Sequence, residues 1–300
     1  RQRLLAKPGD DRIKLILLDQ QSLDWGRQTH NLAWPWPREI YGMVLDFCRQ
    51  SGAKSAAIDI LFTEPSILGH DDDVALGTAL KNWPGAVPAM LPSHIVGSAS
   101  HWPENIRANP WSIDPQSLYL TDEQAAMLVM PGAMFSLPVL VGDSPAQGHV
   151  RATLDNEVVT HVLPFQIFDG KIIPLLGLAG YRDDASPDQL PVITVEQDAF
   201  KIGQHELPLD SLGRTILRYR QHRSTKKKQA PWPYESLSMM DVVESALRVA
   251  EGKPPVIDPA TLKDRHIMIG FSAPGLYDMH ATPMQKEGTP GVIVHATALD

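Results

Sequence analysis

The chain has 300 residues, 43% of them hydrophobic, so it is long enough to bury a substantial core and has the composition of a globular protein. It carries 35 acidic against 27 basic side chains, and the formal net charge of -8 argues against a nucleic-acid-binding surface. The one cysteine, Cys48, cannot form an intramolecular disulfide, and no cluster of Cys and His residues indicates structural zinc. Proline and glycine interrupt the apolar stretches, which fall far short of the ~20 residues that span a bilayer.

The beginning of the chain alternates between strand and helix patterns. Residues 13–18 are apolar and β-preferring, which predicts a buried strand ending at Asp19. Apolar residues recur at helical spacing over 39–50, just after Pro37, and predict a helix. The apolar run 55–62 predicts a second strand, and strand, helix and strand together fit a right-handed parallel crossover.

The middle of the chain is more irregular. A helix is predicted to begin near 71–73, and residues 85–91 predict a third strand. Between about 97 and 131 the tryptophans and prolines follow no period, so we expect a long loop insertion without regular elements. Short β-like runs follow over 148–219, including a predicted hairpin around Asp169-Gly170.

The last part returns to the α/β pattern. Ser238, with Asp241 three residues later, opens a helical pattern that Gly252 ends. Residues 267–271 predict another strand, and a new helix is expected after Pro290-Gly291. The expected fold class is α/β, a mixed sheet with parallel crossover units plus antiparallel hairpins, in a single domain that spans the chain.

Short motifs along the chain are more specific than these patterns. The first are LDQQSL at 18–23, WPWPR at 34–38 and AIDILFTEP at 57–65. Later motifs are GHVR at 148–151, with Pro164, and IMIGFSA at 267–273, followed by Leu276, Asp278, Thr282-Pro283 and Pro290-Gly291-Val292. This ordered set resembles the second type of CHASE domain, the cyclase and histidine-kinase associated sensory extracellular domain, over roughly the whole chain.

The resemblance implies a location and a role. Such domains lie on the periplasmic or extracellular side of the bacterial cell membrane and feed cytoplasmic histidine kinases, nucleotide cyclases or serine/threonine kinases. Since the chain begins without Met or a signal peptide, we expect the flanking transmembrane helices and the output domain to lie outside these 300 residues. Two features depart from the family: Gln20 replaces a second acid after Asp19, which weakens an acidic-pair ligand scheme, and 97–131 carries no family motif.

Polar side chains are expected to converge where the predicted strands end. Asp19 and Asp59 follow two strands that we expect to be parallel neighbours, and open α/β sheets bind ligands at such carboxyl ends. The candidate ligand-binding residues of this crevice are Asp19, Arg38, Asp59, Glu64, Ser272, Asp278 and His280. The alternative is that Asp19 and Asp59 cap helices or bind loop amides.

The sequence does not decide whether the domain binds a metal ion, and it indicates no other cofactor. Asp19, Asp59 and Glu64 offer the oxygen ligands that calcium or magnesium prefers, but not the dense acidic spacing of such sites. An aromatic motif either lines a pocket or braces the first predicted helix against the sheet, and we favour bracing. Its residues are Trp34, Pro35, Trp36, Pro37 and Phe62.

Two charged segments are best explained without a ligand. The acids at 71–73 open a predicted helix and stabilise its positive end. A basic segment could face anionic lipid headgroups, although we favour a solvated loop. It contains Arg214, Arg218, Arg220, Arg223 and Lys226-Lys227-Lys228.

Catalysis has little support. A serine hydrolase would use Ser272 in GFSAPG at 270–275, with His295 among the downstream histidines, but a nucleophile elbow requires Gly-x-Ser-x-Gly. An aspartate-nucleophile phosphatase would use Asp19, but Gln21 stands where its general acid is expected. Phosphate-binding and dinucleotide-binding glycine motifs are absent.

The sequence therefore predicts a sensor domain that is not itself an enzyme. An unknown small molecule or environmental signal would shift the population between two arrangements of the crevice and so move the chain ends. A homodimer is expected by analogy, and the flanking helices would tether the domain to the membrane. The competing interpretation is a protein-binding module in which exposed Trp102 and Trp111 dock a partner.

Overall fold

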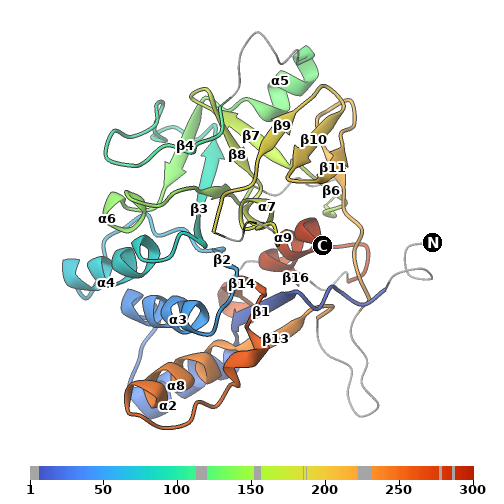
Figure 1. Ribbon diagram of the computed structural model, residues 1–300. Helices are drawn as coiled ribbons and strands as arrows, with labels where there is room; N and C mark the ends of the chain where they lie inside the picture. Colours follow the sequence, from blue (N-terminus) through green and yellow to red (C-terminus); the bar gives the residue numbers. More distant parts are fainter. Residues whose placement is uncertain are drawn as a thin grey trace.

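A mixed sheet forms the centre of the molecule (Figure 1). The computed structural model describes residues 7–112, 120–151, 157–184, 186, 188–221, 232–276, 279–285 and 288–300. Within these ranges the sheet order is β13-β1-β14-β2-β3-β4, and β5 also pairs with β3. The strands are β1 (Ile13–Leu18), β2 (Ser55–Ile58), β3 (Ala86–Ser93), β4 (Gly132–Phe135), β5 (Gly148–His149), β13 (Glu235–Ser238) and β14 (His266–Phe271). All these pairs are parallel except that of β3 with β4, which confirms the expected α/β class.

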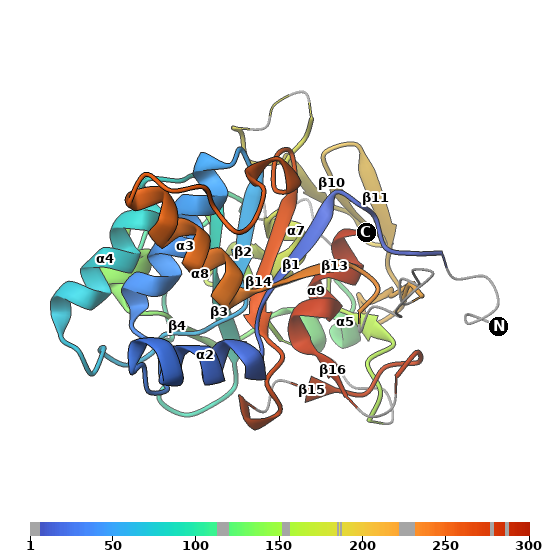
Figure 2. The same cartoon turned by 90° about the horizontal axis from the view of Figure 1, so that it is seen from below.

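Helices cover both faces of this sheet (Figure 2). On one face lie α2 (Gln20–His30), α3 (Arg38–Gln50), α4 (His70–Lys81), α6 (Pro138–Val141) and α8 (Met239–Ala250); on the other lie α7 (Leu176–Ala179) and α9 (Gly291–Leu299). Strand β1 shows why both layers are needed, because all six of its residues are buried. Ile16 and Leu18 join the core beneath α3, whereas Leu15 and Leu17 join the core beneath α9. A strand buried on both faces is the usual state of a parallel sheet.

A second, antiparallel part packs outside α7 and α9. It contains β6 (His161–Val162), β7 (Phe165–Phe168), β8 (Lys171–Pro174), β9 (Ile193–Val195), β10 (Ala199–Ile202), β11 (His205–Pro208) and β12 (Thr215–Ile216), and two short strands, β15 (Met279–His280) and β16 (Thr289–Pro290), pair nearby. Leu178 of α7 and Val294 of α9 belong to the core of this part, together with Phe165 and Phe200. The two helices are therefore enclosed between the sheet and the antiparallel part.

Several predicted elements are confirmed. Strand β1, helix α3 and helix α8 agree with the patterns to within a residue, and α9 begins directly after Pro290. Strands β7 and β8 form the predicted hairpin, since Asp169 and Gly170 both have positive φ, 49° and 71°, as a type I′ turn requires.

Two parts of the fold differ from the expectations. Strand β14, from the end of the chain, lies between β1 and β2, so the expectation that Asp19 and Asp59 follow neighbouring strands was wrong. Within 97–131 the structure forms a short helix, α5 (Asp122–Leu128). Its start has a capping box in which Thr121 and Gln124 each accept a bond from the other's backbone N–H, at 3.2 and 3.1 Å. Among the helices of the described ranges, none is both long and apolar enough to cross a membrane.

Candidate functional site

At the carboxyl end of β1, Asp19 serves as the N-cap of α2. Its Oδ1 accepts the backbone N–H and the hydroxyl of Ser22, each at 2.7 Å, and the hydroxyl of Ser238 at 3.0 Å. Ser238 ends β13, so this one carboxylate joins a helix start to the neighbouring strand. The capping alternative for Asp19 is what the structure shows.

Arg38 lies at the start of α3, in a buried cluster. Its Nη1 forms an ion pair with Asp73 Oδ1 at 2.6 Å, and its Nη2 donates to the backbone carbonyl of Glu64. The guanidinium also lies over the Phe62 ring, 5.0 Å from its centroid. The carboxylate of Glu64 is exposed and takes no part in these contacts. Arg38 and Glu64 therefore meet through structural contacts, and Phe62 belongs to the same cluster.

The acids at the start of α4 stabilise α3. Asp72 accepts the backbone N–H groups of Arg38 and Glu39, at 2.9 Å each, and the hydroxyl of Ser66. Burial alone would raise the pKa of Asp72, but these hydrogen bonds and the charge of Arg38 outweigh it, so its pKa lies below the ordinary value. The acidic segment thus caps the neighbouring helix as well as opening its own.

The Trp-Pro motif forms the entry to α3. Trp36 is 3% exposed, belongs to the core beneath α3 and packs on Gly26 of α2. Pro37 is the N-cap residue, and the bond between Trp34 and Pro35 is cis. The Trp34 side chain is 44% exposed, and its ring lies perpendicular to the Phe271 ring with the two centroids 5.4 Å apart.

Asp59, after β2, lines a small pocket with His280. The pocket has a volume of about 20 Å³, near that of one water molecule. Asp59 Oδ1 lies 3.7 Å from His295 Nε2, and these side chains are 9% and 5% exposed. Arg151 also lines the pocket. Of the predicted crevice residues, Asp59 and His280 are thus brought together, whereas the sequence pointed to His295 only as a hydrolase histidine.

His149 lies buried beside this pocket. Its Nε2 bonds to the carbonyl of Leu163 at 3.1 Å. Burial, together with the charges of His295 and Arg151, lowers the pKa of His149 to about 3, so its ring is neutral. His149 and Arg151 belong to the GHVR motif, which was the sequence signal for this part of the site.

Of the remaining predicted residues, the structure describes Ser272 but not Asp278. The Ser272 backbone N–H donates to the carbonyl of Leu18 at 3.1 Å, and Ser272 does not line the pocket of Asp59 and His280. Asp278 lies outside the described residues. Nor do the described ranges hold any group of three or more His, Cys, Asp or Glu side chains placed for a metal ion. Among the described candidates, Asp19, the Arg38–Glu64 pair, the Asp59–His280 pair and Ser272 have separate sets of contacts.

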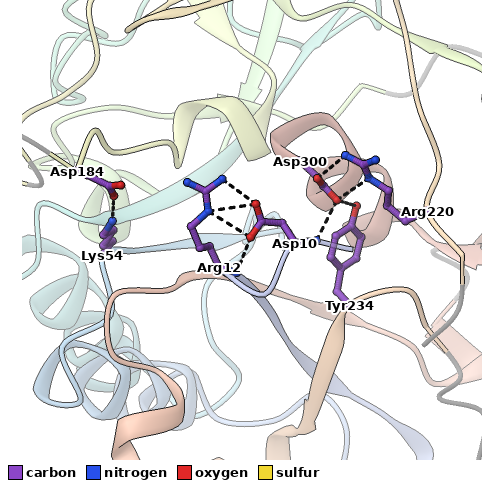
Figure 3. A network of polar contacts seen from close by, with 7 residues as sticks. All are labelled: Asp10, Arg12, Lys54, Asp184, Arg220, Tyr234 and Asp300. Atoms are coloured by element: carbon purple, nitrogen blue, oxygen red, sulfur yellow. Dashed lines mark hydrogen bonds and ion pairs between the residues drawn. The ribbon is translucent and has the colours of Figure 1, made fainter. Parts of the chain in front are cut away.

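A row of polar contacts lies at the opposite, amino-terminal edge of the sheet (Figure 3). Lys54, Arg12 and Tyr234 immediately precede β2, β1 and β13. Lys54 pairs with Asp184, and Arg12 holds both carboxylate oxygens of Asp10, with Nη2 at 2.7 Å. The hydrogen bond from Arg12 is the main reason why the pKa of Asp10 is lowered.

Asp300, at the end of α9, occupies the far end of this row. Arg220 donates to both its oxygens, at 2.6 and 2.9 Å, and the Tyr234 hydroxyl donates at 3.1 Å. The backbone N–H of Asp10 donates to the same carboxylate at 3.2 Å. This Asp300 clamp, formed by Asp300, Arg220, Tyr234 and Asp10, joins the segment before β1 to the end of α9.

A cavity of about 220 Å³ opens beside the Asp300 clamp. Its lining residues are Asp10, Arg12, Ile13, Leu178, Tyr181, Ile202, His205, Glu206, Leu207, His266, Ala298, Leu299 and Asp300. His266 bonds to the Ser55 hydroxyl at 2.9 Å, and burial, with the charges of Lys54 and Arg182, lowers its pKa to about 4. No sequence motif pointed to this cavity, because its lining comes from separate short segments.

Two further predictions concern surface residues. Trp102 is half-buried, with its ring centroid 5.1 Å from that of Phe135, and Trp111 is 8% exposed with its indole N–H donated to a carbonyl, so neither is a fully exposed tryptophan. In the basic segment, Arg214 pairs with Asp210 at 2.9 Å and Arg220 belongs to the Asp300 clamp. Arg223 and the three lysines at 226–228 lie outside the described residues.

Comparison with known proteins identifies a family but no individual relative. Neither the curated proteins nor the solved structures give a match to the chain. The family model of the CHASE2 domain matches residues 1–300. The chain therefore belongs to the CHASE2 family, the sensory, non-catalytic domains that membrane receptors carry on the extracellular or periplasmic side.

Proposed function

We propose that this domain transmits a stimulus across the membrane to a cytoplasmic histidine kinase, nucleotide cyclase or serine/threonine kinase in the same receptor. The observation that supports this most directly is the Asp300 clamp, because it ties the segment entering β1 to the end of α9. A change that opens or tightens the clamp would alter how these two segments lie relative to one another.

Helix α9 is suited to carry such a change. Gly291 to Thr297 are all buried, so the helix cannot shift without its surroundings. Its first half, through Val294 and His295, lines the small Asp59 pocket, and its end, through Ala298 and Asp300, lines the large cavity. Events at either edge of the sheet therefore act on the same helix.

The proposed mechanism is a population shift between two positions of α9. A stimulus shifts such an equilibrium only by its differential affinity for the two states, and each tenfold difference is worth about 1.4 kcal/mol. The Asp300 clamp biases the equilibrium without a ligand, since its charged hydrogen bonds exist in one position of the helix end.

The test is the variant Asp300→Asn in the membrane receptor that contains this domain. It keeps the side-chain shape but removes the charge that holds Arg220. We expect the basal output, measured as phosphoryl transfer and as cyclic nucleotide formation from ATP, to change several-fold. The matched control is Asp24→Asn, which removes the same charge from an exposed pair with Arg27 and should leave output unchanged. Wild-type output from a folded Asp300→Asn receptor would contradict the proposal.

We further propose, by analogy with receptors of this design, that the domain works as a homodimer. Analytical ultracentrifugation of the 300-residue chain tests this. A monomer over the whole micromolar range would contradict it. The protein-docking alternative has less support, because Trp111 is buried and Trp102 is half-buried.

A further inference from the structure

The cavity beside the Asp300 clamp is enclosed by segments that are distant in sequence. It lies between the amino-terminal edge of the sheet, represented by Ile13, and the β10–β11 hairpin, represented by Leu207. Leu178 of α7 and Leu299 of α9 complete its aliphatic lining together with Ile202. Its volume of about 220 Å³ is below the ~300–1,000 Å³ of drug-sized sites, so it suits a small metabolite.

One wall of the cavity is aromatic. The rings of Tyr181 and His266 are nearly parallel, with an interplanar angle of 19° and centroids 6.1 Å apart. The His205 ring meets Tyr181 edge-on at 5.4 Å. Gly203, at the turn of the β10–β11 hairpin, lies close to the Tyr181 ring and has a φ of 56°, so the turn itself positions this wall. A planar ring system is the chemistry that such a wall binds best.

The charges around the cavity are already paired within the protein. Asp10 pairs with Arg12 at 2.7 Å, and Asp300 pairs with Arg220 at 2.6 Å. Glu206, whose side chain is 62% exposed to solvent, lies 3.7 Å from Lys201, which also pairs with Glu196 at 2.5 Å. The low pKa of His266 keeps its ring neutral. A charged ligand would lose hydration here without gaining an unpaired partner, and that loss is costly.

We infer that this cavity binds a small uncharged aromatic molecule with a hydrogen-bonding group, and that the molecule is the signal of the receptor. The planar body would stack on one of the perpendicular rings of Tyr181 and His205, meet the other edge-on and lie against the aliphatic lining, and its polar group would reach the polar rim formed by Arg12. That the bound molecule is the signal rests on the proposed function, whereas its binding to the cavity does not. Occupancy would act on Ala298 and Asp300 and hence on the end of α9.

Indole is the probe, with tryptamine and indole-3-acetate as its cationic and anionic counterparts. Titrations of the 300-residue chain, followed by saturation-transfer NMR, should show saturable indole binding with a Kd of about 0.1–1 mM, as expected for a fragment of this size. Both charged probes should bind at least tenfold more weakly. Equal or tighter binding of either charged probe, or no saturable indole binding, would overturn the inference.

Two variants locate the binding. Ala298→Phe fills the cavity from α9 and should weaken indole binding at least tenfold, whereas Ala126→Phe, at an exposed position of α5, should not change it. Should Ala298→Phe fail to fold, His205→Ala on the exposed hairpin removes part of the wall and should weaken binding about threefold to tenfold. His94→Ala is its exposed control.

Unchanged indole affinity in a folded Ala298→Phe or His205→Ala chain would place the binding elsewhere and overturn the inference. These titrations involve no output domain, and the Asp300→Asn comparison involves no ligand. Failure of the ligand site and failure of the proposed signalling role are therefore seen in different experiments.

Discussion

The two edges of the parallel sheet use their polar residues in opposite ways. At the carboxyl edge, Asp19 caps a helix and Arg38 is held in a buried ion pair, and the pocket at Asp59 has a volume of only about 20 Å³. At the amino edge, a cavity of about 220 Å³ remains open beside the Asp300 clamp. Ligands of open α/β sheets normally bind at the carboxyl ends of the strands.

This difference between the two edges shows that the position of a ligand site in an open α/β sheet depends on which segments cover each edge. At the carboxyl ends of β1, β14 and β2 the Trp-Pro motif brings Trp34 against Phe271, and Asp59 and His280 line a pocket of only about 20 Å³, so little space remains at this part of the edge. At the amino edge the β10–β11 hairpin stands away from the strand starts and leaves room between Ile13 and Leu207. The antiparallel part therefore encloses a cavity at the end of the sheet opposite to Asp19 and Asp59.

Removing the buried ion pair of Arg38 at the carboxyl edge should have the largest effect on stability. Arg38→Met leaves the buried carboxylate of Asp73, whose side chain is 3% exposed, without its cationic partner and with only the Ser66 backbone N–H bonded to it. Removing one partner of a buried pair typically costs about 3–5 kcal/mol, which urea denaturation measures. The control Arg27→Met breaks an Arg–Asp pair whose side chains are 70% and 40% exposed and should cost at most about 0.5 kcal/mol. Similar losses in both variants would show that the Arg38 cluster is not buried in solution.

Lowering the pH should reduce the stability of the fold through one buried histidine at each edge of the sheet. The pKa of His149 is about 3 and that of His266 about 4, both below the ordinary value near 6.5 because the rings are buried. As the pH falls below about 6.5 the unfolded chain binds these protons first, so stability is complete above that pH and declines toward the folded-state pKa values. At about 1.4 kcal/mol per pH unit, each histidine costs roughly 2–3 kcal/mol between pH 7 and 4.5.

His149→Gln and His266→Asn remove this acid sensitivity one edge at a time. The glutamine amide would keep a donor for the Leu163 carbonyl, and the asparagine amide would keep a partner for the Ser55 hydroxyl. Each variant should lose roughly 2–3 kcal/mol less than the wild type when urea denaturation is repeated at pH 7 and 4.5. An unchanged pH dependence in either variant would mean that the corresponding ring is already protonated, or solvated, in the folded protein.

The elements of the carboxyl edge could be predicted because their signals are local. The buried run at 13–18 and the helical period of 39–50 each depend on residues adjacent in sequence, and both were confirmed. The position of β14 between β1 and β2 could not be found this way, because it depends on long-range pairing such as Ile16 with Ile269. Asp19 and Asp59 were consequently expected on adjacent strands.

The cavity at the amino edge could not be predicted from the sequence. Arg12, His266 and Leu299 become neighbours only after three strands, a hairpin and a helix have assembled, and none belongs to a short motif. The motif residues were instead a guide to packing: within WPWPR, Trp36 is buried in the core and Arg38 forms a buried ion pair. Recurring polar residues in a sequence therefore need not line the open site.

The contact between α7 and α9 should be less costly to disturb than the Arg38 cluster. A Cβ added to Gly177 would lie 2.1 Å from the backbone oxygen of His295, so Gly177→Ala must push the helices apart. Overpacking of this kind costs about 1–3 kcal/mol. The control Gly42→Ala, in α3, meets its nearest atom at 3.4 Å and should stabilise the chain by up to about 1 kcal/mol. Thermal unfolding would show opposite shifts in Tm, and shifts of one sign would contradict the close contact.

The smallest effects should come from Asp19, and they separate capping from charge. Asp19→Ala removes the acceptor for Ser22 and Ser238 and should cost about 1 kcal/mol, whereas Asp19→Asn keeps an acceptor and should stay within a few tenths. The pKa of Asp241 is raised by burial and, second, by the negative charge of Asp19. Asp19→Asn should therefore lower the pKa of Asp241 toward its ordinary value, which carboxyl-carbon NMR can follow during a pH titration. An Asp241 that titrates unchanged would mean that the two carboxylates do not interact, and that the carboxyl edge carries no electrostatic coupling beyond its caps.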